Sequence, residues 1–130
     1  MGTRRIAPIS DTEMEVLKAL WDHGPGTVRE LHALLGQRGN KWAYNTVLTL
    51  LQRLEAKEVV RSDKSGLAHV FHARVSRDKL LQQRLKHLAQ ELCDADAAPL
   101  VLALMEGHRF TSEEIDQFRQ LLDQLEEKQR

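Results

Sequence analysis

Residues 42–73 read WAYNTVLTLLQRLEAKEVVRSDKSGLAHVFHA, and they predict a helix that runs directly into a β-hairpin. In the helical part, apolar residues recur at three- and four-residue spacing and share one face, which we expect to be buried. These residues are Val47, Leu50, Leu51 and Leu54. The opposite face is polar, and its side chains can hydrogen-bond base edges and phosphates. They are Asn45, Thr49 and Gln52, flanked by Thr46 and Arg53.

The segment after this helix has the composition of a β-hairpin. Val59–Ser62 is rich in β-branched residues, Asp63–Gly66 has turn residues, and Ala68–Ala73 can alternate between the two faces of a sheet. Lys64 at the tip and Arg61 at the base would let the hairpin lie against a phosphate backbone. Both segments have a simpler interpretation. The helix could be an amphipathic helix whose polar face contacts only water, and the tip of the hairpin could be a solvated turn that happens to carry a lysine.

Two helices are expected upstream, each opened by a capping box, in which paired side chains satisfy free backbone N–H groups. Ser10 and Glu13 open the first, which Gly24-Pro25-Gly26 ends. Thr27 and Glu30 open the second, which ends near Gly36 and is followed by a polar, basic loop over residues 37–41. The side chains expected to face the core are Met14, Leu17, Leu20 and Trp21, then Val28, Leu31, Leu34 and Leu35. The order of helix, helix, recognition helix and hairpin predicts a winged helix-turn-helix domain.

Two blocks of sequence carry a family resemblance. Ile9–Trp21 fits the pattern I-S-D-x-E-x-x-V-x-x-x-L-W, and Trp42–Lys57 fits W-x-x-x-T-V-x-T-L-L-x-R-L-x-x-K. In both blocks the chain resembles the penicillinase repressor family of bacterial transcription factors, the BlaI, MecI and CopY group. The resemblance implies a homodimeric transcriptional repressor that binds double-stranded operator DNA, and a regulatory protease that cleaves the dimerisation part to relieve repression. It also implies that Lys41 and Arg53 contact mainly phosphate.

Two positions depart from the family pattern. The family usually has glycine after the lysine that ends the recognition helix, because that residue commonly takes a left-handed conformation as a helix cap. This chain has Glu58 there, so we expect modest strain or a different helix end. The family tends to have arginine after the glycine of the wing, where this chain has Leu67, and the contact between wing and DNA is therefore left open.

Charge is distributed unevenly in a chain whose formal net charge is zero. Residues 1–75 contain 11 lysines and arginines against 8 aspartates and glutamates, and residues 76–130 contain 8 against 11. Within residues 29–74 the count is 8 basic to 4 acidic. Charges in solution interact over a Debye length of about 8 to 10 Å, so the local charge matters more than the net charge of the chain. The excess of basic residues over residues 29–74 therefore favours a polyanionic partner.

The C-terminal third predicts an assembly element. We expect a winged helix-turn-helix domain at residues 1–75 and a helical dimerisation domain at residues 76–130, giving a mainly α fold with a small β-hairpin. Leucines at spacings of four, three and four would form one seam, and a last helix, opened by Thr111 and Glu114, would form another. The seams consist of Leu81, Leu85, Leu88 and Leu92, then Ile115, Phe118, Leu122 and Leu125. The alternative is a monomer whose helices fold back on the winged domain.

Several other classes of protein are disfavoured. Cys93 is the single cysteine, which excludes an internal disulfide and a multi-thiolate metal site, and the six histidines have no ligand spacing. His69 and His72, three apart in a strand, would point to opposite faces. No nucleotide-binding loop, nucleophile motif or HExxH occurs, so we expect no enzyme, cofactor or metal. No 18-residue apolar run or signal peptide occurs, so we expect a cytoplasmic protein without membrane insertion.

Two functional alternatives stay open beside a DNA-binding repressor. One is a winged-helix module that binds proteins, since a fold does not fix a function. The other is a regulator whose helical third encloses a small molecule, for which an aromatic content of 5% offers little pocket lining.

Overall fold

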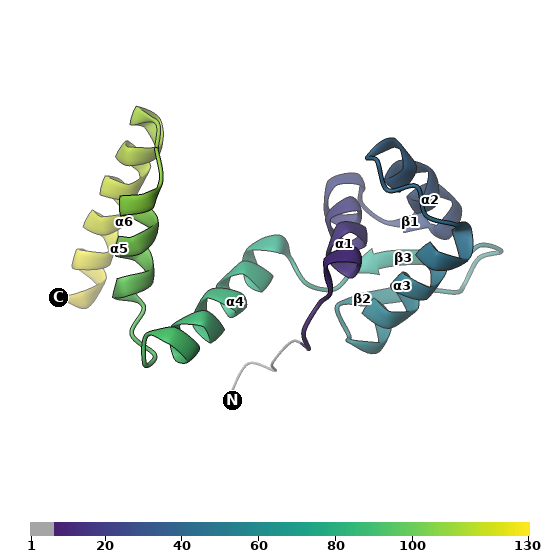
Figure 1. Cartoon of the computed structure of the whole chain (residues 1–130), viewed down its shortest axis with the longest axis horizontal. Coiled ribbons are helices and arrows are strands. Elements are labelled where there is room, and N and C mark those ends of the chain that lie inside the picture. The colour runs from purple at the N-terminus through teal and green to yellow at the C-terminus, as the bar shows by residue number, and fades with distance from the viewer. Residues whose placement is uncertain (1–6) are drawn as a thin grey trace. The chain divides into compact units, whose positions relative to one another are not determined.

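The computed structural model describes residues 7–130, which form six helices and three short strands. The chain divides into two compact units, one ending at Leu85 and the other covering Lys86–Arg130, with the boundary inside helix α4 (Figure 1). The sequence predicts that the DNA-binding domain ends at residue 75, and this functional boundary stays a prediction. The boundary between the two compact units lies ten residues later, after Leu85.

The first unit holds three helices and a small sheet. Helix α1 spans Asp11–His23, α2 spans Val28–Gln37 and α3 spans Tyr44–Ala56. Both predicted capping boxes are present, because Ser10 and Thr27 each accept the backbone N–H three residues on, and the glutamates at those positions accept in return. Gly24 ends α1 with a φ of 93°, a conformation that glycine adopts without steric cost.

The sheet has one strand more than the predicted hairpin. Strands β2 (Val60–Asp63) and β3 (Val70–Ala73) pair antiparallel, with Ser62 opposite Phe71. Strand β1 (Gly26–Thr27) adds to the free edge of β3, giving the order β1-β3-β2. Two residues directly after a glycine-proline turn carry no strand periodicity, so the sequence could not reveal β1. The turn is also longer than predicted, because the loop covers residues 64–69 and His69 precedes the strand.

The core of this unit lies between the three helices and the sheet. The predicted apolar face of α3 is buried in full, and the relative exposure of Val47, Leu51 and Leu54 is zero. The predicted residues of α1 and α2 line the same cluster, although Met14, Trp21 and Leu34 are only partly buried. Val59, Val60 and Phe71 close the cluster from the sheet. Burial of one continuous apolar surface fixes the direction in which the polar face of α3 points.

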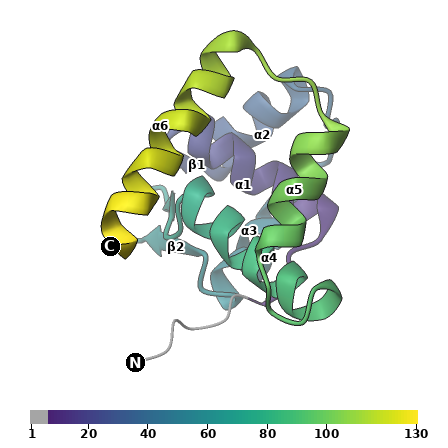
Figure 2. The ribbon, with the colours of Figure 1, turned by 90° about the vertical axis from the view of Figure 1, so that its left-hand side faces the viewer.

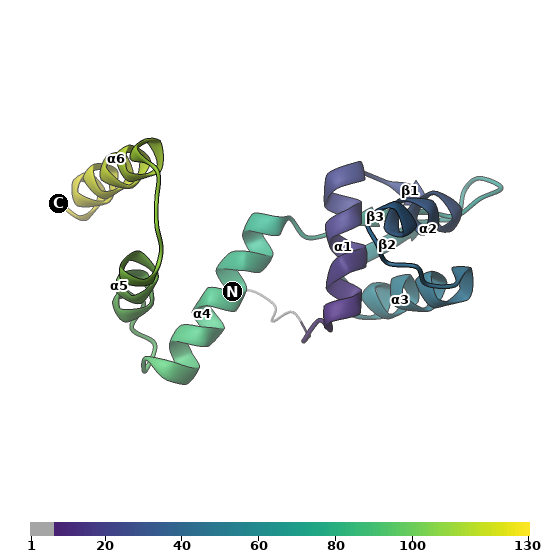
Figure 3. The same cartoon turned by 45° about the horizontal axis from the view of Figure 1, so that its top comes forward.

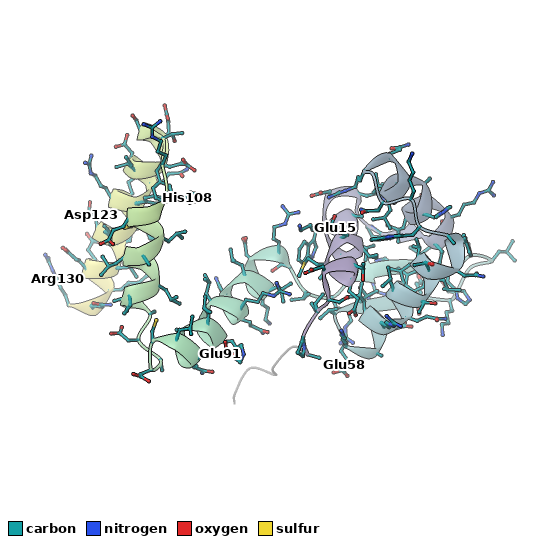
Figure 4. All side chains as sticks on the ribbon, in the orientation of Figure 1. Glu15, Glu58, Glu91, His108, Asp123 and Arg130 are labelled. Atoms are coloured by element: carbon teal, nitrogen blue, oxygen red, sulfur yellow. The ribbon has the colours of Figure 1, made fainter. Side chains whose placement is uncertain are left out.

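The end of α3 shows how the chain deals with the missing glycine. Glu58 has a φ of 63°, in the left-handed region, and it lies at the end of the helix (Figure 4). Its N–H donates to the carbonyl of Glu55, and the N–H of Val59 donates to the carbonyl of Leu54. This is the Schellman pattern that glycine usually completes. The expected strain is therefore present, and the helix ends in the same way as with glycine.

A cluster around Asp22 attaches the start of α4 to this unit. Asp22, in α1, accepts hydrogen bonds from Arg38 at 2.8 Å and from Arg77, the first residue of α4, at 2.9 Å. These hydrogen bonds hold the pKa of Asp22 below its ordinary value of 3.8. The Arg77 guanidinium also lies over the ring of Trp21, whose Nε1 donates to the carbonyl of Val75. The first turns of α4 (Arg77–Leu92) thus belong structurally to the winged unit.

The second unit consists of the rest of α4, α5 (Ala98–Gly107) and α6 (Ser112–Gln129). Helices α5 and α6 run in roughly opposite directions, joined by a short loop (Figure 2). The predicted capping box of Thr111 and Glu114 opens α6, and Phe110 packs edge-on against Phe118 at 5.0 Å. Neither α5 nor α6 contains a buried residue. Within residues 7–130, no helix has the length and apolar character that crossing a membrane requires.

Candidate nucleic-acid interface

The outer face of α3 presents the polar side chains of this helix that the sequence predicts as base or phosphate contacts. They are exposed, and Lys41, just before the helix, is exposed as well. The residues on this face are Asn45, Thr46, Thr49, Gln52 and Arg53. Since the opposite side of α3 is anchored in the core, this face is held rigidly toward solvent. A rigid, polar helix face is the element that enters the major groove in helix-turn-helix proteins.

Thr49 is preorganised by its own helix. Its hydroxyl donates to the backbone carbonyl of Asn45 at 2.9 Å, a bond to the preceding turn that threonine often makes inside helices. The hydroxyl oxygen keeps its acceptor lone pairs and the residue is exposed, so Thr49 can accept from a base amino group or touch a thymine methyl.

Helix α3, like α5, begins without a side-chain cap from its N-cap residue. Ala43 provides no side-chain hydrogen bond, whereas α1, α2 and α6 all begin with complete capping boxes. Among the described residues, no acceptor faces the backbone N–H groups of Tyr44 and Asn45. Free N–H groups at a helix start carry a partial positive charge, which favours a nearby anion.

A brace from α2 fixes the chain just before α3. The Nε2 atom of His32 lies 2.8 Å from the carbonyl oxygen of Trp42, and the histidine ring meets Tyr44 edge-on at 6.1 Å. Because a carbonyl can only accept, Nε2 carries the proton. No sequence pattern indicates this pair, because it depends on the packing of α2 against α3.

The loop between β2 and β3 projects from the side of the unit on which α3 begins (Figures 1 and 3). Lys64 in this loop and Arg61 in β2 are both exposed, as predicted, and Leu67 is exposed in full. Hydrogen bonds from the side chain and the backbone N–H of Ser65, the latter at 3.0 Å, lower the pKa of Asp63 and keep the base of the loop negatively charged. The basic character of the wing is therefore weaker than its lysine and arginine suggest.

The cations of the region fall into two groups. Lys57 and Arg38 are bound internally, to Glu13 and Asp22. The others form no ion pair within the described residues: Arg29, Lys41, Arg53, Arg61, Lys64 and Arg74. Arg29 on α2 and Arg74 after β3 are exposed as well. The sequence analysis did not single them out, and the only sequence signal for them is the local excess of basic residues over residues 29–74. Six cations thus remain available to attract a polyanion.

The predicted dimerisation residues lie on the surface of the single chain. Leu81 and Leu85 belong to the first unit, and the other six lie in the second. Seven of the eight are exposed, from Leu88 at 38% to Leu92 at 73%, and Phe118 is partly covered by Phe110. The described residues contain no group of three His, Cys, Asp or Glu side chains that could hold a metal ion.

Comparison with known proteins identifies relatives over nearly the whole chain. The chain is 25% identical to the penicillinase repressor of Bacillus licheniformis over 93% of this chain and 94% of that protein. It is 30% identical to the transcriptional regulator BlaI of Mycobacterium tuberculosis over 94% of this chain and 88% of that protein.

A solved structure matches the winged part of the chain. It is the solution structure of monomeric Bacillus licheniformis BlaI in complex with the blaP half-operator, 28% identical, with a TM-score of 0.50 over 59% of this chain and 93% of that chain. The winged-helix fold predicted from the sequence is thereby confirmed. The family is one of repressors, not of enzymes. Since the model of the penicillinase repressor family matches residues 9–124, this chain belongs to that family.

Proposed function

We propose that the chain is a homodimeric, sequence-specific repressor of transcription that acts in the cytoplasm on a pseudo-palindromic operator. The observation that carries this proposal is the exposed polar face of α3, which is fixed by a buried apolar face. The same unit carries exposed cations that form no ion pair within residues 7–130. The related structure of a BlaI monomer on a half-operator supports one winged domain for each half-site.

The contacts divide by chemistry. Asn45, Thr49 and Gln52 face the base edges, because they lie at the centre of the exposed face of α3 and have both donor and acceptor atoms. Thr46 and Arg53 flank this face toward one wall of the groove. Lys41, Arg61 and Lys64 act on phosphates, which position the domain without reading the sequence.

Dimerisation follows from the second unit. Helices α5 and α6 contain no buried residue. Five of their large apolar side chains are at least half exposed: Val101, Leu102, Leu104, Leu121 and Leu122. Apolar surface of this extent is stabilised by burial, and a second copy offers matching helices around a twofold axis. Two linked domains then bind two half-sites with an effective-concentration advantage, often a factor of about 10² to 10⁴.

Release from the operator follows if this assembly is cut. Residues 94–109 connect α4 to α6, and all but Leu100 are exposed in the single chain. Asp94 and Ala95, which begin this connection, both have positive φ angles of 51° and 68°. A regulatory protease that cuts here would detach α6 and forfeit the advantage of two-site binding.

The test is selection of duplexes from a random-sequence library with the full-length chain. The proposal expects enrichment of a pseudo-palindrome whose half-sites lie about 10 base pairs apart, or a multiple of that. Affinity for the enriched duplex should fall steeply with salt and exceed affinity for a scrambled duplex. If no sequence is enriched, the chain is not an operator-binding repressor, and binding of a protein partner becomes the better account of the winged domain.

A further inference from the structure

Tyr44 is the exposed aromatic residue of the winged unit. It is the first residue of α3, and 47% of its surface is accessible. Trp21 and Trp42 are partly buried, and Phe71 is buried. No described residue forms a hydrogen bond with the phenolic hydroxyl, although the ring itself is in contact with a neighbour. An exposed ring with an unused hydroxyl, adjacent to the polar face of α3, has no role in the core.

The ring of Tyr44 is held by α2. His32 packs edge-on against it, with ring planes at 72° and centroids 6.1 Å apart. The same histidine is anchored by its Nε2 atom on the carbonyl of Trp42, two residues before the tyrosine. This arrangement restricts the ring before any ligand binds, and a restricted side chain loses less entropy on contact.

The phase of the helix gives the direction of Tyr44. Successive residues of a helix are rotated by about 100° around its axis. Tyr44 and Thr46 therefore lie about 100° from Asn45 on opposite sides, and Tyr44 is on the side toward α2. Asn45 stands at the centre of the exposed face, and Thr46 and Arg53 occupy the flank away from α2. Tyr44 therefore occupies the opposite flank, which faces the other wall of a major groove.

We propose that Tyr44 donates its hydroxyl to a phosphate of the DNA backbone and that His32 is the residue that positions it. The inference rests on the proposed function and adds to it a second point of attachment, opposite the one made by Arg53. Tyrosine hydroxyls are among the side-chain groups that donate to phosphates and fix the register of a protein on the duplex. The contact places the N-terminal end of α3 and so sets which base edges Asn45 and Thr49 reach.

The experiment replaces single phosphates of a selected duplex by methylphosphonates, which removes the charge at one position at a time. Wild-type chain, Tyr44→Phe and His32→Ala are compared in full-length form. We expect Tyr44→Phe to bind unmodified selected and scrambled duplexes about three- to tenfold more weakly, the effect of one hydrogen bond. At one phosphate, the methylphosphonate should weaken the wild type by a similar factor and leave Tyr44→Phe unchanged. His32→Ala should reduce this coupling at the same phosphate and add little to Tyr44→Phe.

A matched control removes a hydroxyl elsewhere in the unit. Thr12 lies in the first turn of α1 and is exposed, and its hydroxyl is 3.2 Å from that of Ser10, so Thr12→Val removes one exposed hydrogen bond and should keep the affinity and the methylphosphonate profile of the wild type. Thermal unfolding of Tyr44→Phe should match the wild type, because the ring and its contact with His32 remain.

Equal affinity of Tyr44→Phe and wild type would overturn the proposal. Weaker binding with an unchanged methylphosphonate profile would overturn it too, since the hydroxyl would then contact a base. If the wild type enriches no duplex, the proposed function fails, and this contact fails with it.

Discussion

The ammonium group of Lys57 lies 2.7 Å from Oε1 of Glu13, which joins the end of α3 to the start of α1. Both residues belong to the two sequence blocks that carry the family resemblance, but neither faces the proposed DNA surface. Glu13 is 3% exposed, and its carboxylate also accepts the N–H of Ser10. Lys57 donates in addition to the carbonyl of Pro8. This pair sets the position of the recognition helix relative to the rest of the domain.

Replacing Lys57 should destabilise the fold substantially. Lys57→Met leaves the buried Glu13 carboxylate without its cation, and we expect a loss of about 2 to 3 kcal/mol in the free energy of unfolding measured in urea. Lys18→Met is the matched control, because its pair with Glu15 on α1 is far more accessible to solvent than Glu13 and should contribute less than about 0.5 kcal/mol. Equal losses in the two variants would contradict a structural role for the buried pair.

Stability should fall in acid because of Glu13. Burial alone would raise its pKa, but hydrogen bonds from Lys57 and Ser10 outweigh burial and place the pKa below the ordinary value of 4.5. A carboxylate whose pKa is lower in the folded state contributes stability that is complete above the unfolded value and is lost as the pH falls through the folded value. We expect the urea midpoint of the wild type to drop below pH 4.5. The drop should be smaller in Glu13→Gln, and parallel pH profiles would exclude Glu13 as a source.

Replacing Glu58 by glycine should stabilise the domain. A residue with a side chain costs about 1 kcal/mol in the left-handed conformation, and glycine removes most of this cost. We therefore expect Glu58→Gly to raise the free energy of unfolding by up to about 1 kcal/mol. Ala56→Gly, at the last residue of α3, where no left-handed conformation is needed, should instead lower it, by less than about 1 kcal/mol. A lower stability of Glu58→Gly would show that contacts of the glutamate side chain outweigh the backbone strain.

The two kinds of DNA contact on α3 should separate by salt dependence. Thr49→Ala should relax the sequence preference at one base pair, with a cost on the order of 1 kcal/mol, and Thr49→Ser should keep most of the preference if the hydroxyl is the reader. Arg53→Ala should weaken all duplexes alike and reduce the slope of log affinity against log salt by about one unit. Fluorescence anisotropy at several salt concentrations measures both quantities. Unchanged operator affinity in both alanine variants would remove α3 as the recognition helix.

A chain that ends at Asp94 should be largely monomeric. It keeps the winged unit and α4 but loses α5 and α6, whose exposed leucines we assign to the dimer interface. We expect sedimentation as a monomer at micromolar concentration and an operator affinity lower by a factor of about 10² or more. Inserting five base pairs between the half-sites should weaken the full chain similarly, because one half-site then faces the other side of the duplex. A dimeric fragment with full affinity would assign assembly to the α4 seam alone.

Local chemistry made the starts of three helices and the buried face of α3 predictable from the sequence. Capping boxes at Ser10, Thr27 and Thr111 each depend on residues three apart, and the buried face of α3 depends on helical periodicity. At Glu58 the family pattern, which usually has glycine, led us to expect either strain or a different helix end, and the structure has the strained, left-handed residue. The exposed polar face of α3 followed directly, since it is what remains when the apolar face is buried.

Tertiary structure decided the features that join distant segments. Strand β1 exists because β3 offers a free edge, and the links of Asp22 with Arg38 and Arg77 join residues 16 and 55 positions apart. The charge count included Arg38 and Lys57 among the cations of the DNA-binding region, but packing pairs Lys57 with the buried Glu13 and Arg38 with Asp22 at the surface. His32 and Tyr44 meet only because α2 packs on α3. Composition and periodicity report which side chains a segment offers, but which of them pair is fixed when the segments pack and distant charges and rings come within a few ångströms of one another.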